Sequence, residues 1–442
     1  MIKKRVAFAT LGCKVNQSET EAMKDLFQER GYQVVDFGDS ADVYVINTCT
    51  VTHLADRKSR QLVRRASRRS PAALIAVVGC WAQTAPAAVE ELPEVDVIVG
   101  TRDRGRIVDY VEEAASGKQR VNRVQKLDAA INFEELPLDY STRTRAYLKI
   151  QDGCDQFCTY CIIPYARGPV RSRVPERVRA AAESLVTSGY KEIVLTGIHL
   201  GLYGRDLEPG TRLLTVLRLL EDLPGLERVR LSSLDPAEVT PEILDHLASS
   251  ERTCHHLHIP LQSGSDAVLK RMGRPYTAGE YLDLVRAVRD RLPRAGITTD
   301  IIVGFPGETE AEFQETLTVV REAGFSRLHV FTYSPRQGTP AAEYPNQVKP
   351  QVKEERSHRL ISLGKELAMV FHASYLEQEL MVLVEEEREG GKLAGYSDNY
   401  IRVRFNGPDE LMNHVLPVRV LAATSDYVEG EVAKTSPPLI TA

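Results

Sequence analysis

Three cysteines near the middle of the chain, Cys154, Cys158 and Cys161, have the spacing Cys-x3-Cys-x2-Cys. Three thiolates can hold three irons of a 4Fe-4S cube and leave the fourth iron open to a small molecule, much as a catalytic zinc site keeps one position open. The alternative is a zinc site completed by Cys254 or by a neighbouring histidine. Structural zinc usually shows paired Cys-x2-Cys or His spacing, so this spacing favours an iron–sulfur cluster.

Cys13, Cys49 and Cys80 each follow a short apolar run by two or three residues. If those runs are parallel strands of one sheet, their carboxyl ends share one edge, and the three thiols can meet. The alternative is that they are small buried residues, as most free cysteines are. Three such placements in one small region favour a second cluster. Cys254 lacks this pattern, and we expect it to pack in the core.

The elements around Cys13, Cys49 and Cys80 alternate between strand and helix, which is typical of a parallel α/β sheet. The strand candidates are Arg5–Thr10, Gln33–Asp36, Val43–Asn47, Leu74–Val78 and Val95–Val99. Ser18 and Glu21 form a capping-box pair in the first helix, and Gly31 is expected just past its end.

From Ala146 the alternation restarts and gives six strand–helix units. Its strand candidates are Tyr147–Ile150, Ile193–Leu195, Arg228–Leu231, His256–Ile259, Thr299–Val303 and Leu328–Phe331, with helices at Glu176–Ser188, Tyr281–Arg291 and Glu310–Glu322. Six units predict a parallel sheet curled into part of a barrel, although periodicity alone leaves an open doubly wound sheet as the alternative. The Cys154 loop follows the first of these strands, at the end where such sheets carry their chemistry.

After a helical stretch from Gln351 to about Tyr375, apolar and polar residues alternate around Gly395, Gly407 and Gly430, as in a small antiparallel barrel. We therefore expect an α/β fold with an N-terminal parallel sheet domain (1–116), a linker (117–143), a partial (β/α)6 barrel (144–345), a helical connector (346–378) and a small β-barrel (379–442).

Two basic runs directly follow the predicted cluster cysteines. Residues 53–70 hold seven Lys or Arg against one acid, and residues 140–180 hold eight against three. A basic run is usually a solvated face, but runs beside both clusters favour an anionic polymer held there. The expected RNA contacts are Arg57, Arg64, Arg65, Arg68, Arg167, Arg171 and Arg173. The C-terminal region from Glu379 on, with eleven acids and six bases, does not add to this charge.

Composition excludes several classes of protein. Hydrophobic content of 43% and charged content of 26% are globular values, and a net charge of −5 argues against a protein that coats nucleic acid unselectively. The apolar run Val6–Leu11 is too short for an export signal, and Ala72–Ala82 is far below the ~20 residues that span a bilayer. We expect no membrane association and a cytoplasmic location, where reduced thiols favour metal ligation over disulfides.

The Cys154 loop resembles the signature of the radical S-adenosylmethionine (SAM) superfamily. In that superfamily a 4Fe-4S cluster chelates SAM and cleaves it to a 5′-deoxyadenosyl radical. The resemblance implies an aromatic residue near the adenine at Tyr160, a loop around the methionyl amino group at Gly197, and a glycine-bearing SAM strand that ends at Gly304. Ser233 and Gln262, at the ends of other strands, are further candidates for the SAM pocket.

The segments Leu11-Gly-Cys13-Lys-Val-Asn, Asn47-Thr-Cys49-Thr-Val-Thr and Gly79-Cys80, together with Val330 to Pro340, look like the methylthiotransferase family of radical SAM enzymes. The resemblance covers nearly the whole chain. It implies an N-terminal methylthiotransferase domain, a radical SAM barrel and a C-terminal TRAM domain. It also implies two 4Fe-4S clusters as cofactors, with SAM as both radical source and methyl donor.

The segment around Cys13 and Cys49, with Ala55-Asp-Arg-Lys-Ser-Arg-Gln after it, looks like the branch that modifies N6-threonylcarbamoyladenosine next to the tRNA anticodon. The expected partners are the tRNA anticodon stem-loop, an electron donor such as a flavodoxin or ferredoxin, and a sulfur source. The alternatives are methylthiolation of isopentenyladenosine in tRNA or of a ribosomal protein, and, in another class, a non-catalytic zinc-bearing RNA-binding protein.

Overall fold

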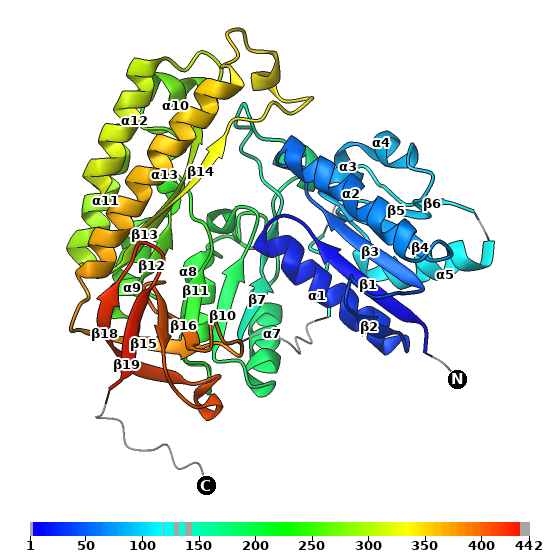
Figure 1. Ribbon diagram of the computed structural model, residues 1–442, viewed down its shortest axis with the longest axis horizontal. Coiled ribbons are helices and arrows are strands. Elements are labelled where there is room, and N and C mark those ends of the chain that lie inside the picture. Colours follow the sequence, from blue (N-terminus) through cyan, green and yellow to red (C-terminus); the bar gives the residue numbers. More distant parts are fainter. Residues whose placement is uncertain (1–2, 118, 128–131, 138–143, 434–442) are drawn as a thin grey trace.

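Three bodies make up the computed structural model of the 442-residue chain, which describes residues 3–117, 119–127, 132–137 and 144–433. An N-terminal domain and a larger barrel domain lie side by side, and a small C-terminal barrel adjoins the larger one (Figure 1). Parts of the predicted linker and the end of the predicted C-terminal barrel lie outside the described residues. Within the described ranges, no helix combines the length and the apolar character that crossing a membrane requires.

The N-terminal domain is a six-stranded sheet in the order β2-β1-β3-β4-β5-β6, with every neighbouring pair parallel. Its strands are β1 (Arg5–Thr10), β2 (Gln33–Val35), β3 (Val43–Thr48), β4 (Leu74–Gly79), β5 (Val97–Val99) and β6 (Val121–Asn122). The order reverses between β1 and β3. In open α/β sheets, ligands bind at such a reversal, beyond the carboxyl ends of the strands.

Helices cover both faces of this sheet because its strands are apolar on both sides. Side chains of α1 (Lys14–Glu29) and α5 (Ile107–Gly117) pack into one buried cluster. Those of α2 (His53–Arg69), α3 (Cys80–Thr84) and α4 (Pro86–Glu90) pack into the other.

The five strands predicted for this domain are confirmed, with bounds that differ by at most two residues. The predicted capping box is wrong: α1 already begins at Lys14, and Ser18 lies inside it, where its hydroxyl donates to the Tyr147 carbonyl of the next domain at 3.1 Å. Gly31 lies past the helix end with φ 87, as expected. The predicted linker also contributes β6 to the sheet, so this domain runs beyond the predicted boundary at residue 116.

The barrel domain carries six parallel strands whose spatial order is their order in the sequence. They form two three-stranded sheets, joined by bridges from Val229 to Thr253 and from Ser233 to His258. The strands are β7 (Arg145–Lys149), β10 (Glu192–Thr196), β11 (Arg228–Leu231), β12 (His256–His258), β13 (Gly296–Val303) and β14 (Arg327–Thr332). Because a doubly wound sheet would reverse its order, the sequential order confirms the partial barrel.

Helices lie outside the barrel strands, and α13 packs along β14 at the open edge (Figure 1). The long helices are α7 (Pro175–Thr187), α8 (Leu213–Glu221), α9 (Pro241–Ser249), α10 (Asp266–Met272), α11 (Ala278–Arg291), α12 (Glu310–Ala323) and α13 (Pro350–Ala373). Short elements shape the loops: β8 (Gln151–Asp152), β9 (Arg171–Ser172) and α6 (Ile163–Arg167), with 3-10 turns η1 (Arg104–Arg106), η2 (Leu200–Leu202), η3 (Pro236–Glu238) and η4 (Pro340–Glu343).

The C-terminal body is a closed five-stranded barrel in the order β15-β16-β17-β19-β18. It consists of β15 (Glu379–Val384), β16 (Leu393–Ser397), β17 (Arg402–Phe405), β18 (Val415–Ala423) and β19 (Val428–Val432), with a 3-10 turn η5 (Asp409–Leu411). The barrel was expected to be antiparallel, and four of its pairings are, but β17 and β19 run parallel.

This small barrel caps the amino ends of the large barrel's strands. Arg228, the first residue of β11, donates to the carbonyls of Tyr396 and Met381 at 3.0 and 2.6 Å. Gly296, the first residue of β13, lies so close to the Asn399 carbonyl that a Cβ would come within 2.2 Å of the oxygen. The carboxyl ends of the strands, where the chemistry is expected, therefore lie on the opposite side of the large barrel, away from the small one.

Candidate active site

The sheet of the N-terminal domain brings Cys13, Cys49 and Cys80 to one edge. Cys13 is the N-cap of α1 after β1, Cys49 directly follows β3, and Cys80 opens α3 after β4. Strands β1, β3 and β4 are neighbours, so the three thiols converge as predicted. Gly12 packs against Cys49. Only glycine fits there, because the φ of Gly12 is +106 and a Cβ would lie 2.8 Å from the Cys49 Cβ.

Two of these three thiols, those of Cys49 and Cys80, are desolvated. Burial, together with the neighbouring Cys80 and Cys13 sulfurs, raises the pKa of Cys49 to about 12. Cys49 and Cys80 are buried, whereas Cys13 is exposed. A metal cluster would replace the thiol protons, since metals bind the thiolate form. Three thiolates at one point match the donor set of a 4Fe-4S cube with one open iron.

Two buried asparagines hold the ends of β1 and β3 and the start of α1 together. The Asn16 amide donates to the carbonyls of Leu11 and Thr48 at 2.7 and 3.0 Å. The Asn47 amide donates to the Asn16 carbonyl and the Thr20 hydroxyl at 3.0 and 3.1 Å. Sequence reasoning assigned no role to either. For Asn47 the available signal was a polar residue at the end of an otherwise apolar strand.

Cys154, Cys158 and Cys161 lie in the loop between β8 and α6, at the carboxyl end of the barrel sheet. Burial raises the pKa of Cys161 to about 12, with the Cys158 and Cys154 sulfurs adding to the shift. The Cys154 sulfur lies 3.3 Å from His199 Nδ1, and Arg274 donates to the Cys158 sulfur at 3.3 Å. This donor set also fits a cube held by three cysteines.

The geometry does not support the zinc alternative completed by Cys254. Cys254 precedes β12 at its amino end, and its charged neighbours are Arg230 and Glu192 on the floor of the barrel. The Cys154 loop lies at the opposite, carboxyl end of the sheet. Cys254 is buried, as expected for a core residue.

The five residues predicted for the SAM pocket all lie at or beyond carboxyl ends of barrel strands. The Tyr160 ring packs edge-on against Phe305, with centroids 6.5 Å apart, and Gly197 abuts the Gln151 side chain. Ser233 bridges to His258 at the end of β12, and Gln262 takes the left-handed backbone with φ 66 beside β13. These positions remain predictions.

Gly304 has a structural reason of its own to be glycine. Its φ is +70, its N–H donates to the Glu308 carboxylate at 2.6 Å, and a Cβ would lie 2.3 Å from Lys353 Cγ of α13. Its contact with SAM also stays a prediction.

Sequence reasoning missed a polar trio inside the barrel, His258, Asp300 and His329 on the neighbouring strands β12, β13 and β14. Asp300 Oδ1 lies 3.3 Å from His258 Nε2 and 3.1 Å from His329 Nδ1. Although burial opposes it, hydrogen bonds with both histidines hold the pKa of Asp300 well below its usual range. The trio lies on the strands β12, β13 and β14, and Gln262 and Gly304 of the predicted SAM pocket follow the first two of these.

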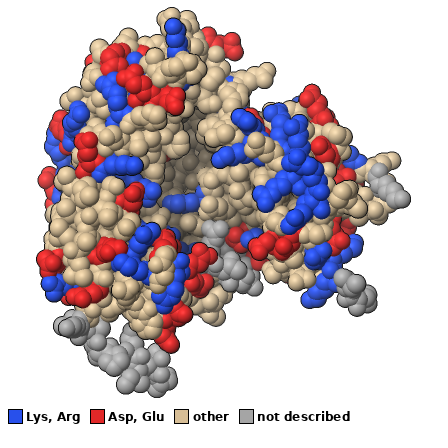
Figure 2. All heavy atoms as spheres, in the orientation of Figure 1, with Lys and Arg blue, Asp and Glu red and all other residues tan. Residues whose placement is uncertain are grey.

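The two basic runs differ in how far their side chains are exposed to solvent. Arg57, Arg64, Arg65 and Arg68 are exposed along α2, where blue side chains gather beside a hollow between the two large domains (Figure 2). Among the described residues, no carboxylate forms an ion pair with any of these four.

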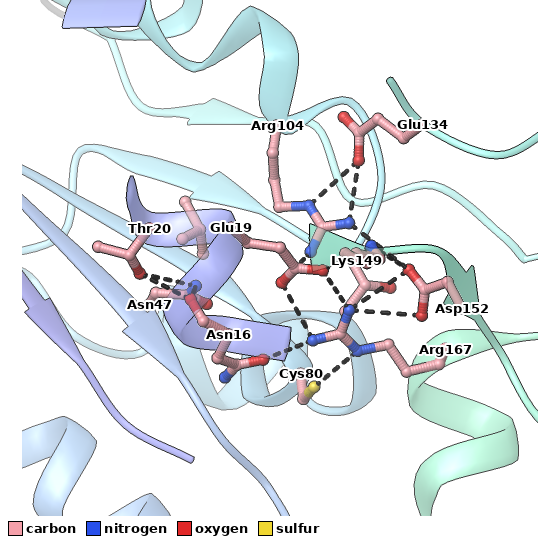
Figure 3. A network of polar contacts seen from close by, with 12 residues as sticks. Asn16, Glu19, Thr20, Asn47, Cys80, Arg104, Glu134, Lys149, Asp152 and Arg167 are labelled. Atoms are coloured by element: carbon pink, nitrogen blue, oxygen red, sulfur yellow. Dashed lines mark hydrogen bonds and ion pairs between the residues drawn. The ribbon is translucent and has the colours of Figure 1, made fainter. Parts of the chain in front are cut away.

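The prediction that Arg167, Arg171 and Arg173 contact RNA is wrong, because all three side chains are buried. Arg167 and Arg171 pair with Asp152, and Arg173 pairs with Glu135 at 2.5 Å. The run is basic because it faces carboxylates of this chain, which include the buried Glu19 and Asp152 (Figure 3).

Comparisons with known proteins agree with this architecture. Residues 5–100 match the model described as uncharacterized protein family UPF0004, and residues 148–320 match the radical SAM superfamily. The radical SAM methyltransferase TsrM from Kitasatospora setae has the same fold, with a TM-score of 0.55 and 16% identity over 77% of this chain and 74% of that one. A partial barrel with the Cys154 loop at the carboxyl end of its strands thus defines a radical SAM enzyme.

The chain is 47% identical to the threonylcarbamoyladenosine tRNA methylthiotransferase MtaB of Bacillus subtilis over 97% of its length and 96% of that protein. The MtaB of Thermotoga maritima is 40% identical over 97% and 99% of the two chains. A tRNA-2-methylthio-N(6)-dimethylallyladenosine synthase of Clostridium botulinum is 35% identical over 96% and 95%. The chain belongs to the methylthiotransferase family of radical SAM enzymes, which use SAM and 4Fe-4S clusters.

Proposed function

We propose that this protein converts N6-threonylcarbamoyladenosine next to the anticodon of tRNA into its 2-methylthio derivative. The observation that carries the proposal is the pair of three-cysteine sites, each at the carboxyl edge of its own parallel sheet. Two relatives that align over nearly the whole chain, at 47% and 40% identity, bear the name of this activity.

Each set of cysteines would hold one cluster. Cys154, Cys158 and Cys161 would bind the cube that holds SAM, with Tyr160, Gly197, Ser233, Gln262 and Gly304 around it. Cys13, Cys49 and Cys80 would bind the second cube. The bound clusters and SAM would supply the radical, sulfur and methyl groups, because acid–base chemistry cannot functionalise the adenine C2–H bond.

The exposed arginines of α2 would hold the RNA. Phosphate contacts supply most of the affinity of such complexes, and α2 begins four residues after Cys49. An anticodon stem-loop bound there would present an unstacked base to the hollow between the domains. An electron donor such as a flavodoxin or ferredoxin and a sulfur source would complete the system, and we place the reaction in the cytoplasm.

The substrate base is tested by supplying the purified, anaerobically reconstituted enzyme with two tRNAs. One carries threonylcarbamoyladenosine and the other isopentenyladenosine, and nucleoside mass spectrometry detects the methylthio product of each. We expect product from the first alone, because a site that hydrogen-bonds a polar substituent rejects an analogue without it far better than an apolar pocket can. Equal turnover of both tRNAs would contradict the substrate assignment and leave the reaction class intact. Methylthiolation of a ribosomal protein in place of tRNA would contradict the assignment of tRNA as the substrate.

A further inference from the structure

Arg167 connects the two cysteine sites. It is the last residue of α6, which begins two residues after Cys161, and its side chain is fully buried. From the barrel domain it reaches into the N-terminal domain, where its Nε donates to the Cys80 sulfur at 3.3 Å (Figure 3). Nearby, the Thr101 hydroxyl of the N-terminal domain donates to the Ala166 carbonyl at 2.7 Å and fixes the end of α6.

The other guanidinium nitrogens hold Arg167 in one orientation. Nη1 donates to Glu19 Oε1 at 2.6 Å, and Nη2 donates to Asn16 Oδ1 at 2.5 Å and to Glu19 Oε2 at 3.1 Å. Because a guanidinium is a rigid planar fork, these bonds aim Nε at the sulfur. Asn16 also ties the ends of β1 and β3 together, so one network positions both the arginine and the cysteines.

The buried network around Arg167 holds more positive than negative charge. Its members are joined by ion pairs across the domain boundary: the cations Arg104, Lys149, Arg167 and Arg171, and the carboxylates Glu19, Asp152 and Glu134. Among the residues that the structure describes, four cations against three carboxylates leave one positive charge. A buried charge is very costly unless it is paired.

The Cys80 site can supply the missing negative charge. An oxidised 4Fe-4S cube held by three thiolates has one net negative charge, and the cation in contact with a thiol of that site is Arg167. Hydrogen bonds to the sulfurs and nearby charge set the reduction potential of such clusters.

We propose that Arg167 is a positioning residue for the N-terminal cluster: it orients Cys80, balances the charge of the cluster and raises its reduction potential. The inference rests on the proposed assignment of Cys13, Cys49 and Cys80 as cluster ligands. It makes the environment of one cluster depend on the loop that holds the other.

The test uses the full chain with Cys154, Cys158 and Cys161 changed to Ala, so that only the N-terminal cluster forms. EPR-monitored redox titration of the anaerobically reconstituted protein then gives the midpoint potential. We expect Arg167→Gln to shift the reduction equilibrium at least tenfold against the reduced form, which is 59 mV for a one-electron couple. Glu19→Gln removes a negative charge from the same network and should shift the potential the opposite way.

Arg171→Gln is the matched control. Arg171 is a buried cation that pairs with Asp152 in the same network, at 3.3 Å, but donates no bond to Cys80. Its replacement should move the potential by less than half as much as Arg167→Gln. An unchanged potential in Arg167→Gln, or an equal shift in Arg171→Gln, would overturn the proposal.

If Arg167→Gln does not fold, the variants Arg167→Lys and Glu19→Gln test the proposal in its place. Arg167→Lys keeps the charge and should keep most of the potential, with an altered EPR line shape because the directed Nε bond is lost. A shift of the wrong sign in Glu19→Gln would overturn the proposal on its own. Absence of iron from the starting triple variant would instead contradict the two-cluster function, so the two failures are distinguishable.

Discussion

At the scale of single residues, two sets of cysteines with the same donor chemistry have different surroundings. Cys154, Cys158 and Cys161 lie in one loop, whereas Cys13, Cys49 and Cys80 come from three strand ends, two of which are tied together by Asn16 and Asn47. The first set can assemble a cluster by local folding alone. The second needs the whole N-terminal sheet.

Changing Cys49 to Ala should remove about half of the bound iron, because one of two equal clusters loses a ligand. Reductive cleavage of SAM to 5′-deoxyadenosine should continue, and methylthiolation of tRNA should stop. Changing Cys158 to Ala should abolish 5′-deoxyadenosine formation. Both products are quantified after addition of dithionite, SAM and tRNA under anaerobic conditions.

Cys254→Ala is the matched control, since Cys254 is equally buried but lies at the other end of the barrel. It should keep its full iron content and both activities. If Cys49→Ala still produced methylthio-adenosine, Cys49 would be a packing residue and the assignment of a second cluster would be wrong.

At the scale of elements, apolar runs predicted the strands well, because a strand buried on both faces must be apolar throughout. β1 and β11 have the predicted bounds. The convergence of Cys13, Cys49 and Cys80 followed from parallel pairing alone. Because β1, β3 and β4 are neighbours in the sheet, the three thiols that follow them lie at one point of its edge.

The burial of Arg167, Arg171 and Arg173 could not be predicted from the sequence. A basic run looks solvated when its counter-ions are distant, and Glu19 precedes Arg167 by 148 residues. The start of α1 was misplaced for a similar reason: Ser18 bonds to the next domain instead of capping a helix. Both errors come from contacts between domains, which local patterns do not contain.

Helix α2 keeps the exposed basic face that the sequence predicted. Replacing Arg57, Arg64, Arg65 and Arg68 with Gln should weaken tRNA binding, and the slope of log affinity against log salt should fall by roughly 0.7–0.9 for each phosphate that the protein no longer neutralises. Binding is measured by fluorescence anisotropy over a series of salt concentrations.

Arg286 and Arg321 are exposed on α11 and α12, on the outer side of the barrel, and their double change to Gln serves as the control. It should leave the salt slope unchanged. Equal slopes in the α2 variant and the unmodified protein would show that α2 does not contact the RNA.

At the scale of the whole molecule, the C-terminal barrel forms the floor of the large one. Its Tyr400 takes the left-handed backbone at φ 70, and its ring lies 4.6 Å from that of His256 and over Arg230. Non-glycine residues in this conformation are uncommon, and such strain persists only where the surroundings enforce it. The loop before Tyr400 meets the amino ends of β11 and β13.

Changing Arg230 to Met should lower the free energy of unfolding by about 3 kcal/mol, because the buried Glu192 loses its two hydrogen-bonded contacts and, among the described residues, keeps only Arg228, at 3.8 Å, as an ion-pair partner. Arg230 holds Glu192 at 2.7 and 3.1 Å and donates to the Asp398 and Ser397 carbonyls of the small barrel. Urea unfolding followed by circular dichroism measures the change.

The exposed pair Arg388 and Asp409 is the comparison, because surface ion pairs contribute little to stability. Arg388→Met should cost much less than Arg230→Met. A loss in Arg230→Met as small as that in Arg388→Met would mean that the contacts of Arg230 do not stabilise the protein.

The closed floor has a kinetic consequence. With the amino ends of the strands covered, we expect SAM, its spent fragments and the target base to pass through the hollow between the two large domains (Figure 2). RNA bound along α2, as proposed, would lie beside that passage, so SAM and its fragments could not be exchanged while the RNA is bound. The enzyme would therefore load its small molecules before the tRNA arrives and release them after it leaves, with each turnover limited by departure rather than by bond making.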